Sequence, residues 1–392
     1  MPTVAARQSR LGTESAFDVL AKARALEAQG RTVVHLEIGE PDFETAPHVS
    51  EAATQALAEG YTHYGPSAGL LPARQAIARY VAGTRDISVD ADQVVITPGA
   101  KPIIFFTIMA VVDEGDEVLL PDPGFPIYES VVQYVGGRAI PLPLHEDRAF
   151  RFDPQDLRRR VTDRTRLIIL NSPQNPTGGV LTAEDLGLVA DVARERDLWV
   201  LSDEIYSRLI YDGEHHSIAA LPGMAERTII LDGFSKTYAM TGWRLGYGIA
   251  PPALVPHLAR LQTNVTSCTA SFVQIAGTAA LEGPQTQVES MLAEFRRRRD
   301  FVVDRLNRIE GARCLSPGGA FYVFPRVDVP GLSSKEIADS LLEHEGVAVL
   351  AGTAFGAQGE GFLRLSFATS MEQLAEGADR IERGLSRLRA AA

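Results

Sequence analysis

Seven short apolar runs recur along the chain between residues 94 and 249, and helical segments separate them. Several of these runs are apolar throughout rather than alternating, which is typical of strands buried on both faces of a sheet. The pattern therefore predicts an α/β fold with a mostly parallel sheet that helices cover. The predicted strands are Val94–Thr97, Glu117–Leu120, Ala139–Leu142, Arg166–Leu170, Leu198–Leu201, Arg227–Leu231 and Leu245–Ile249.

Polar residues cluster directly after several of these predicted strands. Ligands of open α/β sheets bind beyond the carboxyl ends of the strands, so the clusters should converge on one edge of the sheet. The clusters are Gly99–Lys101, Asn171–Asn175, Asp203–Glu204 and Ser235–Lys236.

The flanking regions predict further helices and an α+β region. Helical periodicity covers Ala16–Gly30, residues 47–59, residues 69–83 and a long stretch from about Gln285 into the 300s. The other expected elements are strands at Val33–Gly39, Gly319–Phe324, Val347–Leu350 and Phe362–Phe367, a helix at Ser334–Gly346 and a last helix from Ser370.

Two lobes are expected, because 392 residues are more than one hydrophobic core usually spans. Residues 44–300 should form a large domain and residues 301–392 a small C-terminal domain. Residues 1–43 should be an N-terminal segment that joins the small domain.

Composition narrows the class of protein. The net charge is −12, from 38 basic and 50 acidic residues, which argues against nucleic acid as the main partner. Two cysteines cannot supply a disulfide framework or a metal spacing, so no metal is expected. The sequence has no secretory signal and no apolar run of membrane-spanning length, so a cytoplasmic enzyme is expected.

Lys236 lies in the most informative stretch of the chain, Leu231–Tyr247, between Ser235 and Thr237 and ahead of Arg244. An amine that condenses with a carbonyl needs a depressed pKa and a fixed position. A phosphate nearby needs hydroxyls, backbone N–H groups and a guanidinium. A lysine between Ser and Thr is, taken alone, usually a solvated loop residue. Other segments of the chain, however, supply the missing parts of a Schiff-base site for a pyridine aldehyde phosphate.

Such a site needs a buried carboxylate beside the ring nitrogen to keep that nitrogen protonated. Asp203 ends the apolar strand Leu198–Ser202 and would lie at depth, although capping of the next helix explains it equally well. The ring oxygen needs donors, and Tyr206 and Asn175 are of a suitable type. Asn-Pro-Thr-Gly at Asn175–Gly178 is by itself a turn signal, and its position after a buried strand makes it more specific.

The phosphate needs backbone N–H groups at the start of a helix. Thr97–Lys101 follows a predicted strand and opens an apolar helix. Gly99 allows close backbone approach there, and a helix N-terminus favours an anion. Ser235 and Arg244 would complete the anion site.

Two further residues each allow two interpretations. Phe125 could stack on a cofactor ring, although most buried aromatic residues belong to the core. Arg364 alternates with apolar residues in Phe362–Phe367 and either pairs with a carboxylate of the protein or binds one from a ligand. The strand pattern alone favours the internal ion pair.

Together these motifs resemble those of class I aminotransferases, which are fold type I pyridoxal-phosphate enzymes related to bacterial aspartate and aromatic aminotransferases. The resemblance runs from about Ser15 to the end of the chain. It implies a seven-stranded large domain and a small domain that closes on the substrate. The matching segments, in the family's order, are Ile38–Phe43, Tyr64–Gly69, Asn175–Gly178, Ser202–Tyr206, Ser235–Arg244, Gly318–Tyr322 and Leu363–Ser366.

The resemblance implies roles for the cofactor site. Lys236 would hold pyridoxal 5′-phosphate as a Schiff base and carry the proton, and Asp203 would pair with the pyridine nitrogen. Asn175 and Tyr206 would reach the ring oxygen, and Phe125 would stack on the ring. The implied phosphate site consists of Gly99, Ala100, Lys101, Ser235 and Arg244.

The resemblance also implies a substrate site and a reaction. Arg364 and Asn175 would hold the substrate α-carboxylate, with the backbone of Gly39 closing over it. The family forms homodimers with shared active sites, in which Tyr64 would reach the phosphate of the neighbouring site. The implied reaction is a ping-pong transfer of an amino group between an L-amino acid, either aspartate, an aromatic amino acid or another neutral donor, and 2-oxoglutarate.

Two departures from the family pattern argue against strict aspartate specificity. Phe125 stands where Trp or Tyr is usual, and Thr263–Cys268 lacks the second arginine that grips a side-chain carboxylate.

Two other functions are compatible with part of this pattern. A pyridoxal-phosphate β-lyase or oxidase-type biosynthetic enzyme of the same fold shares the motifs, so the sequence leaves this alternative open. An aminotransferase-like sensing domain of a transcription regulator would need a DNA-binding domain first. Only about 15 residues precede the matching region, too few for a helix-turn-helix domain.

Overall fold

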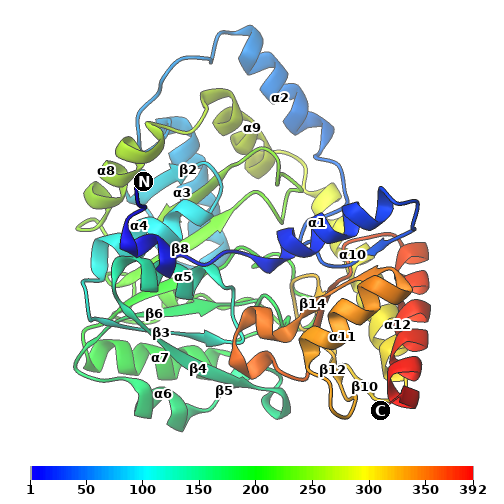
Figure 1. Ribbon diagram of the computed structural model, residues 1–392. Coiled ribbons are helices and arrows are strands. Elements are labelled where there is room, and N and C mark those ends of the chain that lie inside the picture. The colour runs from blue at the N-terminus through cyan, green and yellow to red at the C-terminus, as the bar shows by residue number, and fades with distance from the viewer. Residues whose placement is uncertain (1, 392) are drawn as a thin grey trace.

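The structure, a computed structural model, contains a large lobe built on one sheet and a smaller lobe beside it (Figure 1). It describes residues 2–391, so the outermost residues of the two expected terminal segments, 1 and 392, lie outside the described residues. None of the helices in the described part is both long and apolar enough to cross a membrane.

Within residues 2–391, the central sheet has eight strands in the order β2-β9-β8-β7-β6-β3-β4-β5. The pairs among β4, β3, β6, β7 and β8 are parallel, whereas β9 runs antiparallel to both of its neighbours. The prediction of a mostly parallel sheet is therefore confirmed. The strands are β2 (Val94–Thr97), β3 (Glu117–Asp122), β4 (Arg138–His145), β5 (Arg151–Phe152), β6 (Thr165–Asn171), β7 (Trp199–Asp203), β8 (Thr228–Gly233) and β9 (Gly246–Ile249).

Seven of these strands coincide with the seven predicted runs, and the eighth, β5, is a two-residue edge strand antiparallel to β4. Their uniform apolar pattern arises because helices cover both faces of the sheet. On β6, Leu167 and Ile169 pack into one core cluster and Ile168 and Leu170 into another. The covering helices are α4 (Lys101–Val111), α5 (Ile127–Val135) and α8 (Val255–Thr266) on one face and α6 (Pro154–Arg160) and α7 (Ala183–Glu195) on the other.

A third core cluster joins the β2–β9 end of the sheet to three helices. Two of them were predicted from their period, at residues 47–59 and 69–83. The helices are α2 (Pro47–Ala58), α3 (Leu71–Arg85) and α9 (Ser271–Glu282).

The small lobe combines chain from both ends of the sequence. The N-terminal strand β1 (Val34–His35) pairs in parallel with β13 (Val347–Ala348). A three-stranded sheet has the order β11-β15-β14, and β10 pairs with β12. The remaining elements here are α1 (Ser15–Glu27), β10 (Ala312–Arg313), β11 (Tyr322–Val323), β12 (Arg326–Val327), α11 (Ser334–Ser340), β14 (Leu350–Ala351), β15 (Leu363–Ser366) and α12 (Met371–Ala391). Helix α10 (Thr286–Asn307) connects the lobes: its Val288 packs in the third core cluster, and the helix contacts α12 and β10.

The element types of the small lobe match the sequence pattern, but several boundaries differ. The strands expected at Val33–Gly39 and Gly319–Phe324 pair over only two residues each, and Gly319 forms an isolated antiparallel bridge to Ile210 instead. The helix expected at Ser334–Gly346 is α11 followed by a π-helical turn, Leu341–Glu345. Short 3₁₀ helices occur at Ala6–Arg10, Ala91–Gln93, Glu146–Arg148, Ile218–Ala220, Gly352–Phe355 and Ala357–Gly359.

The core that α10 shares with the small lobe predicts a stability difference between two matched substitutions. Leu306 and Leu57 are each the penultimate residue of a helix, but their side chains are 1% and 46% exposed. Leu306→Ala should lower the free energy of unfolding by roughly 2–5 kcal/mol, and Leu57→Ala by less than about 1 kcal/mol. Denaturant unfolding at one fixed protein concentration measures both, and equal losses would contradict this account of the core.

Candidate active site

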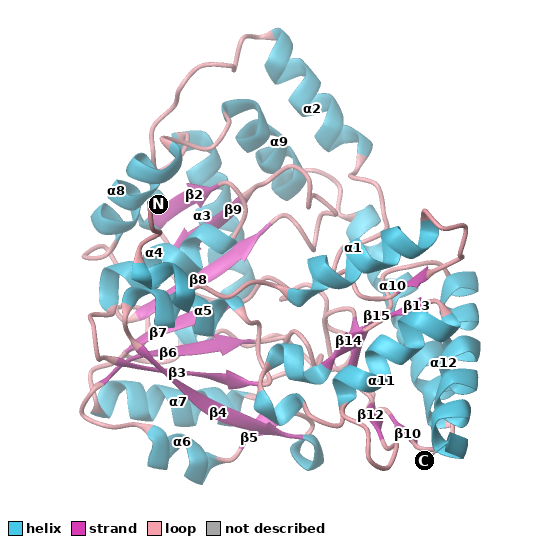
Figure 2. Cartoon of the chain, viewed as in Figure 1, coloured by secondary structure: helices cyan, strands magenta, loops and turns pink. Residues whose placement is uncertain are grey.

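The arrowheads of β3, β6 and β8 point toward the small lobe (Figure 2), and a cavity of about 540 Å³ lies beyond the ends of these strands. Polar clusters that are far apart in sequence meet there, as the strand-end pattern predicts. The predicted site residues that line the cavity are Gly39, Ala100, Lys101, Phe125, Asn175, Asp203, Tyr206, Ser235, Lys236, Arg244 and Arg364.

Lys236 follows β8, and its Nζ donates a hydrogen bond to the backbone oxygen of Gly39 at 2.7 Å. Burial, the strongest influence, lowers the pKa of Lys236 to about 8, against the opposing effect of Glu40 and Glu14. A larger fraction of this amine is therefore neutral near pH 7–8 than in a solvated lysine, whose pKa is about 10.4. The neutral amine is the form that attacks a carbonyl.

Asp203 lies at the end of β7 and is 5% exposed. Tyr128 donates its hydroxyl to Oδ2 at 2.5 Å, and the backbone N–H of Ile205 donates to Oδ1 at 3.2 Å. Burial raises the pKa of Asp203 to about 7, although both hydrogen bonds act to lower it. A carboxylate in this state favours a cationic N–H donor as its next partner.

Two phenols and an amide also line the cavity. The hydroxyls of Tyr206 and Tyr322 are 2.8 Å apart, so one donates to the other. Asn175 is oriented through its backbone N–H, which donates to Oδ1 of Asn171 at 2.9 Å. Tyr206 and Asn175 thus present donor groups to the same space, which suits a ligand oxygen with negative charge.

A cationic pocket forms where α4 begins. Ala100 precedes α4 and Lys101 is its first residue, so the unpaired N–H groups of the helix start face this region. Arg244 Nη1 donates to the backbone oxygen of Thr241 at 2.8 Å, which fixes the guanidinium. Gly99 has φ +82°, and a Cβ there would lie 2.0 Å from Arg244 Nη2, so only glycine allows this approach. The pocket suits a phosphate.

Arg364 on β15 does not form the internal ion pair that the strand pattern favoured, so that expectation is wrong. Its Nη1 donates to Oδ1 of Asn175 at 3.3 Å and its Nη2 to the backbone oxygen of Glu37. Among the described residues, no carboxylate lies within ion-pair distance of Arg364, and its buried Nε has no partner. Burial lowers the pKa of Arg364. The guanidinium instead lies over the rings of Tyr322 and Phe355, and it suits a carboxylate from a ligand.

Two predicted residues do not line the cavity. Gly99 lies behind Arg244, where it makes room for the guanidinium. Tyr64 is 90% exposed and does not reach the cavity of its own chain. Its role at a neighbouring site stays a prediction.

Several lining residues were not assigned a role from the sequence. Tyr128 follows Phe125 by three residues, and their rings meet edge to face with centroids 5.6 Å apart. The three-residue spacing of these aromatic residues at the start of a helix is the sequence feature that could have identified Tyr128. Glu14 forms an ion pair with Lys101. No local sequence pattern predicts this pair, because the two residues come from distant segments of the chain. Asn171 and Tyr322 belong to recognised motifs and act by orienting Asn175 and Tyr206.

The arrangement fits a planar ring that carries a phosphate, a basic nitrogen and an aldehyde. The buried carboxylate of Asp203 accepts hydrogen bonds from two neutral donors. A protonated ring nitrogen would add a third donor, which is positively charged. The cationic pocket and the amine of Lys236 fit the phosphate and the aldehyde, and Phe125 is positioned at the cavity wall to cover a ring face.

Comparison with known proteins agrees with this geometry. The family model described as aminotransferase class I and II matches residues 31–381. An aspartate aminotransferase of Pyrococcus abyssi is 44% identical over 91% of this chain and 92% of its own length. Aromatic-amino-acid aminotransferase 2 of Thermococcus litoralis is also 44% identical, over 91% of this chain and 93% of its own.

A solved structure has the same fold across nearly the whole chain. The aspartate aminotransferase from Thermus thermophilus with maleate superposes with a TM-score of 0.94 at 36% identity, covering 98% of this chain and 100% of that one. The fold is therefore fold type I. The chain belongs to the class I and II aminotransferases, which depend on pyridoxal 5′-phosphate.

Proposed function

We propose that this transaminase moves the amino group of an L-amino acid, either aspartate, an aromatic amino acid or another neutral donor, to 2-oxoglutarate in two half-reactions. The observation that carries the proposal is that Lys236, Asp203 and Arg364 line one cavity. Pyridoxal 5′-phosphate, when bound, supplies the aldehyde that accepts the amino group and the ring that withdraws electrons from the substrate.

Lys236 has two tasks in this proposal. Its Nζ would hold the cofactor covalently, and in the reaction the same Nζ would take the α-proton of the substrate and return it. The pKa of about 8 supports both tasks, because an amine near neutrality can accept and release a proton at physiological pH. The hydrogen bond to Gly39 supports a fixed position for the nitrogen.

In this proposal the charge of Asp203 acts on the cofactor ring, and Arg364 binds the substrate. Asp203 would keep a proton on the ring nitrogen of the bound cofactor, with Tyr128 orienting the carboxylate. Arg364, together with Asn175 and the backbone of Gly39, receives the substrate α-carboxylate. Support comes from the unpaired Nε of Arg364 among the described atoms and from its hydrogen bond to Asn175.

The remaining predicted residues belong to cofactor binding. Asn175 and Tyr206 would donate to the ring oxygen, and Phe125 would cover a face of the ring. The proposed phosphate site consists of Gly99, Ala100, Lys101, Ser235 and Arg244.

The proposal includes several amino donors because the matched relatives are named for different substrates. One matched protein is an aspartate aminotransferase and another an aromatic-amino-acid aminotransferase, at the same identity. The cavity also carries Phe17, Ile38 and Phe125, apolar groups that suit a neutral side chain. A screen of amino donors against 2-oxoglutarate and pyruvate would order the candidates.

The assembly and the domain division are part of the same proposal. We place the large domain at residues 44–300 and the small domain at 301–392, joined by residues 1–43, with the β1–β13 pairing in support. A homodimer would bring Tyr64, which is exposed here, to the neighbouring phosphate site. The two free thiols, Cys268 and Cys314, are consistent with a cytoplasmic location.

The first prediction about the site concerns Lys236. Lys236→Ala should abolish turnover and the visible absorbance of the lysine-bound cofactor, because the variant lacks the amine that forms the bond. Lys22→Ala serves as the control, since the Lys22 side chain is 57% exposed and, among the described residues, pairs only with Asp339. It should retain full turnover. Borohydride reduction of the wild type should label the peptide that contains Lys236, and a label elsewhere would reject the assignment.

A second prediction follows from the lowered pKa of Lys236. In cofactor-free protein, the rate at which pyridoxal phosphate combines with Lys236 should rise with pH and level off above about 8, where the amine is neutral. A solvated lysine would continue to rise toward about pH 10.4. Rapid-mixing absorbance measures the rate, with Lys236→Ala subtracted, and a rise that continues to pH 10 would contradict the burial effect.

A third prediction concerns Tyr128. The hydrogen bond from Tyr128 lowers the pKa of Asp203, so Tyr128→Phe should raise that pKa further above about 7 and leave less carboxylate at neutral pH. Turnover at pH 7 should fall roughly tenfold. Tyr134→Phe, on the same helix, is the control and should change nothing. Equal turnover in both variants would show that the contact is not needed.

A further inference from the structure

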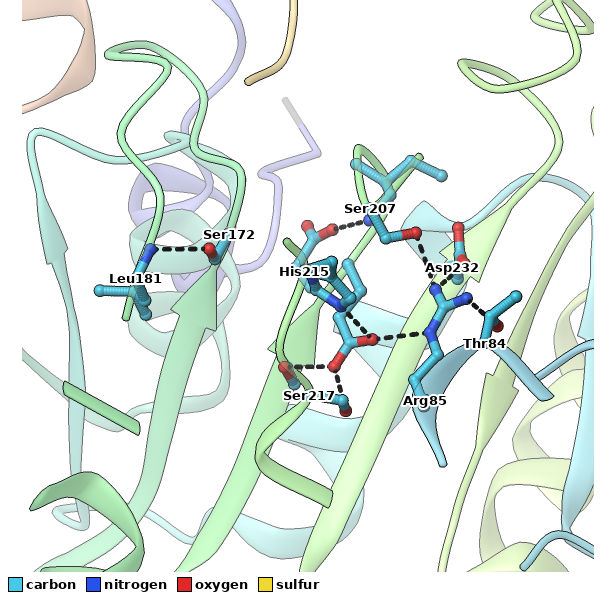
Figure 3. Close-up of polar contacts among 12 residues, drawn as sticks. Thr84, Arg85, Ser172, Leu181, Ser207, His215, Ser217 and Asp232 are labelled. Atoms are coloured by element: carbon cyan, nitrogen blue, oxygen red, sulfur yellow. Dashed lines mark hydrogen bonds and ion pairs between the residues drawn. The ribbon is translucent and has the colours of Figure 1, made fainter. Parts of the chain in front are cut away.

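A buried cluster of charged side chains lies behind the site, between the ends of β7 and β8 and helix α3. Its centre is Arg85, the last residue of α3, which is 4% exposed. Two acidic residues, Glu204 and Asp232, are 1% and 2% exposed. Figure 3 shows Arg85 reaching between Thr84 and Asp232, with His215 nearby. The acids and the arginine are not among the residues that line the cavity.

Arg85 uses every nitrogen of its guanidinium. Nε donates to Oε2 of Glu204 at 3.0 Å, and Nη1 donates to the hydroxyl of Thr84 at 2.7 Å. Nη2 donates to the hydroxyl of Ser207 at 2.8 Å and to the carboxylate of Asp232. A planar fork holds both carboxylates in fixed directions, which a compact ammonium group does not.

Glu204 is held from further sides. The hydroxyls of Ser202 and Ser217 donate to Oε1 at 2.9 and 2.6 Å, and Nε2 of His215 lies 3.0 Å from Oε2. Burial acts most strongly and would raise the pKa of Glu204, but contacts with His215 and Arg85 lower it to about 2. The carboxylate therefore stays charged and bound to Arg85 at physiological pH.

Asp232 connects the cluster to two strands. The backbone N–H of Gly233 donates to Oδ1 at 2.6 Å, and the hydroxyl of Tyr247 on β9 donates to Oδ2 at 3.2 Å. Through Arg85, the ends of β7, β8 and β9 are thus tied to the C-terminus of α3.

Each acid is close along the chain to a residue with a proposed part in the reaction. Glu204 directly follows Asp203 in the sequence. Asp232 lies four residues before Lys236. Asp203 and Leu231 are register partners on β7 and β8, and both line the cavity. Because side chains alternate along extended chain, Glu204 and Asp232 point away from the cavity, toward Arg85.

A buried cluster of this kind is weak evidence for stability. Apolar residues of similar volume often stabilise a core as well as a buried ion pair does. What the cluster provides instead is geometry, because it fixes two neighbouring strand ends relative to each other through charged, directional contacts. Misplacement of reacting groups by about 1 Å can slow a reaction roughly 100-fold.

We propose that Arg85 is a positioning residue: by clamping Glu204 and Asp232 it fixes the placement of Asp203 relative to Lys236. The inference rests on the proposed function, since it assumes that Asp203 and Lys236 act on the same bound cofactor.

The test compares Arg85→Lys with Arg299→Lys. Arg299 is a matched control, because it is 6% exposed, pairs with Asp212 and Asp300, and does not line the cavity. Both variants keep the positive charge and lose the fork. Thermal unfolding, the dissociation constant of pyridoxal 5′-phosphate, the pH midpoint of the bound cofactor's absorbance, and kcat and KM are measured for each.

Arg85→Lys should lower kcat by roughly 10- to 100-fold with KM changed less than about threefold, and should displace the absorbance midpoint. Arg299→Lys should lower the melting temperature by a similar amount while leaving the absorbance midpoint and kcat as in the wild type. If Arg85→Lys loses only melting temperature, as the control does, the inference is overturned. A wild-type protein that takes up no cofactor would instead reject the proposed function itself.

Asp232→Asn decides the matter if Arg85→Lys does not fold. It keeps the shape of the side chain and leaves Arg85 paired with Glu204, but it removes the charged link to β8. The same displacement of the absorbance midpoint, with a smaller fall in kcat, is expected. An unchanged midpoint and kcat in a folded Asp232→Asn protein would overturn the inference.

Discussion

Burial of ionisable groups at the carboxyl ends of β7 and β8 is the constraint on which the rest of the site depends. Loss of water shifts the pKa of Lys236 down to about 8 and that of Asp203 up to about 7. Glu204, the next residue after Asp203, is equally buried and yet its pKa falls to about 2. The difference lies in the partners: Glu204 contacts a guanidinium, an imidazole and two hydroxyls, whereas Asp203 has a phenol and one backbone N–H. Adjacent side chains on one strand thus face opposite environments.

The hydrophobic pattern predicted the large lobe well, because a sheet covered on both faces leaves a strong and unambiguous signal. Each run of apolar residues serves two cores at once, as β6 does, and so all seven predicted strands occur. The signal is weaker where pairing is short. The two-residue strand β5 has no period to detect, and Gly319, expected in a strand of the small lobe, instead forms an isolated bridge to Ile210.

The site was predictable where its residues follow strand ends, and less so where tertiary contacts decide. Asn175, Asp203 and Lys236 all stand at such ends, and topology alone brings them together. The expected internal ion pair of Arg364 is wrong. The alternation of an arginine with apolar residues is the same whether the arginine pairs with a carboxylate of the protein or with one from a ligand. No sequence feature predicted the contacts of Arg85, which ends an amphipathic helix. Only the folded chain places it between two acidic residues that are more than a hundred residues away in sequence.

In the proposed function, the distribution of charge between the lobes would couple substrate binding to chemistry. The small lobe contributes Arg364, whose hydrogen bonds go to neutral oxygens and whose guanidinium lies over aromatic rings, so its positive charge is not neutralised by the described residues. The large lobe contributes Lys236 and Asp203. Lys236 already bridges the lobes through its hydrogen bond to Gly39. A substrate carboxylate bound to Arg364 would neutralise the small-lobe charge and at the same time bring the α-carbon beside the amine. Binding energy gained on one lobe would thereby orient the reacting atom on the other.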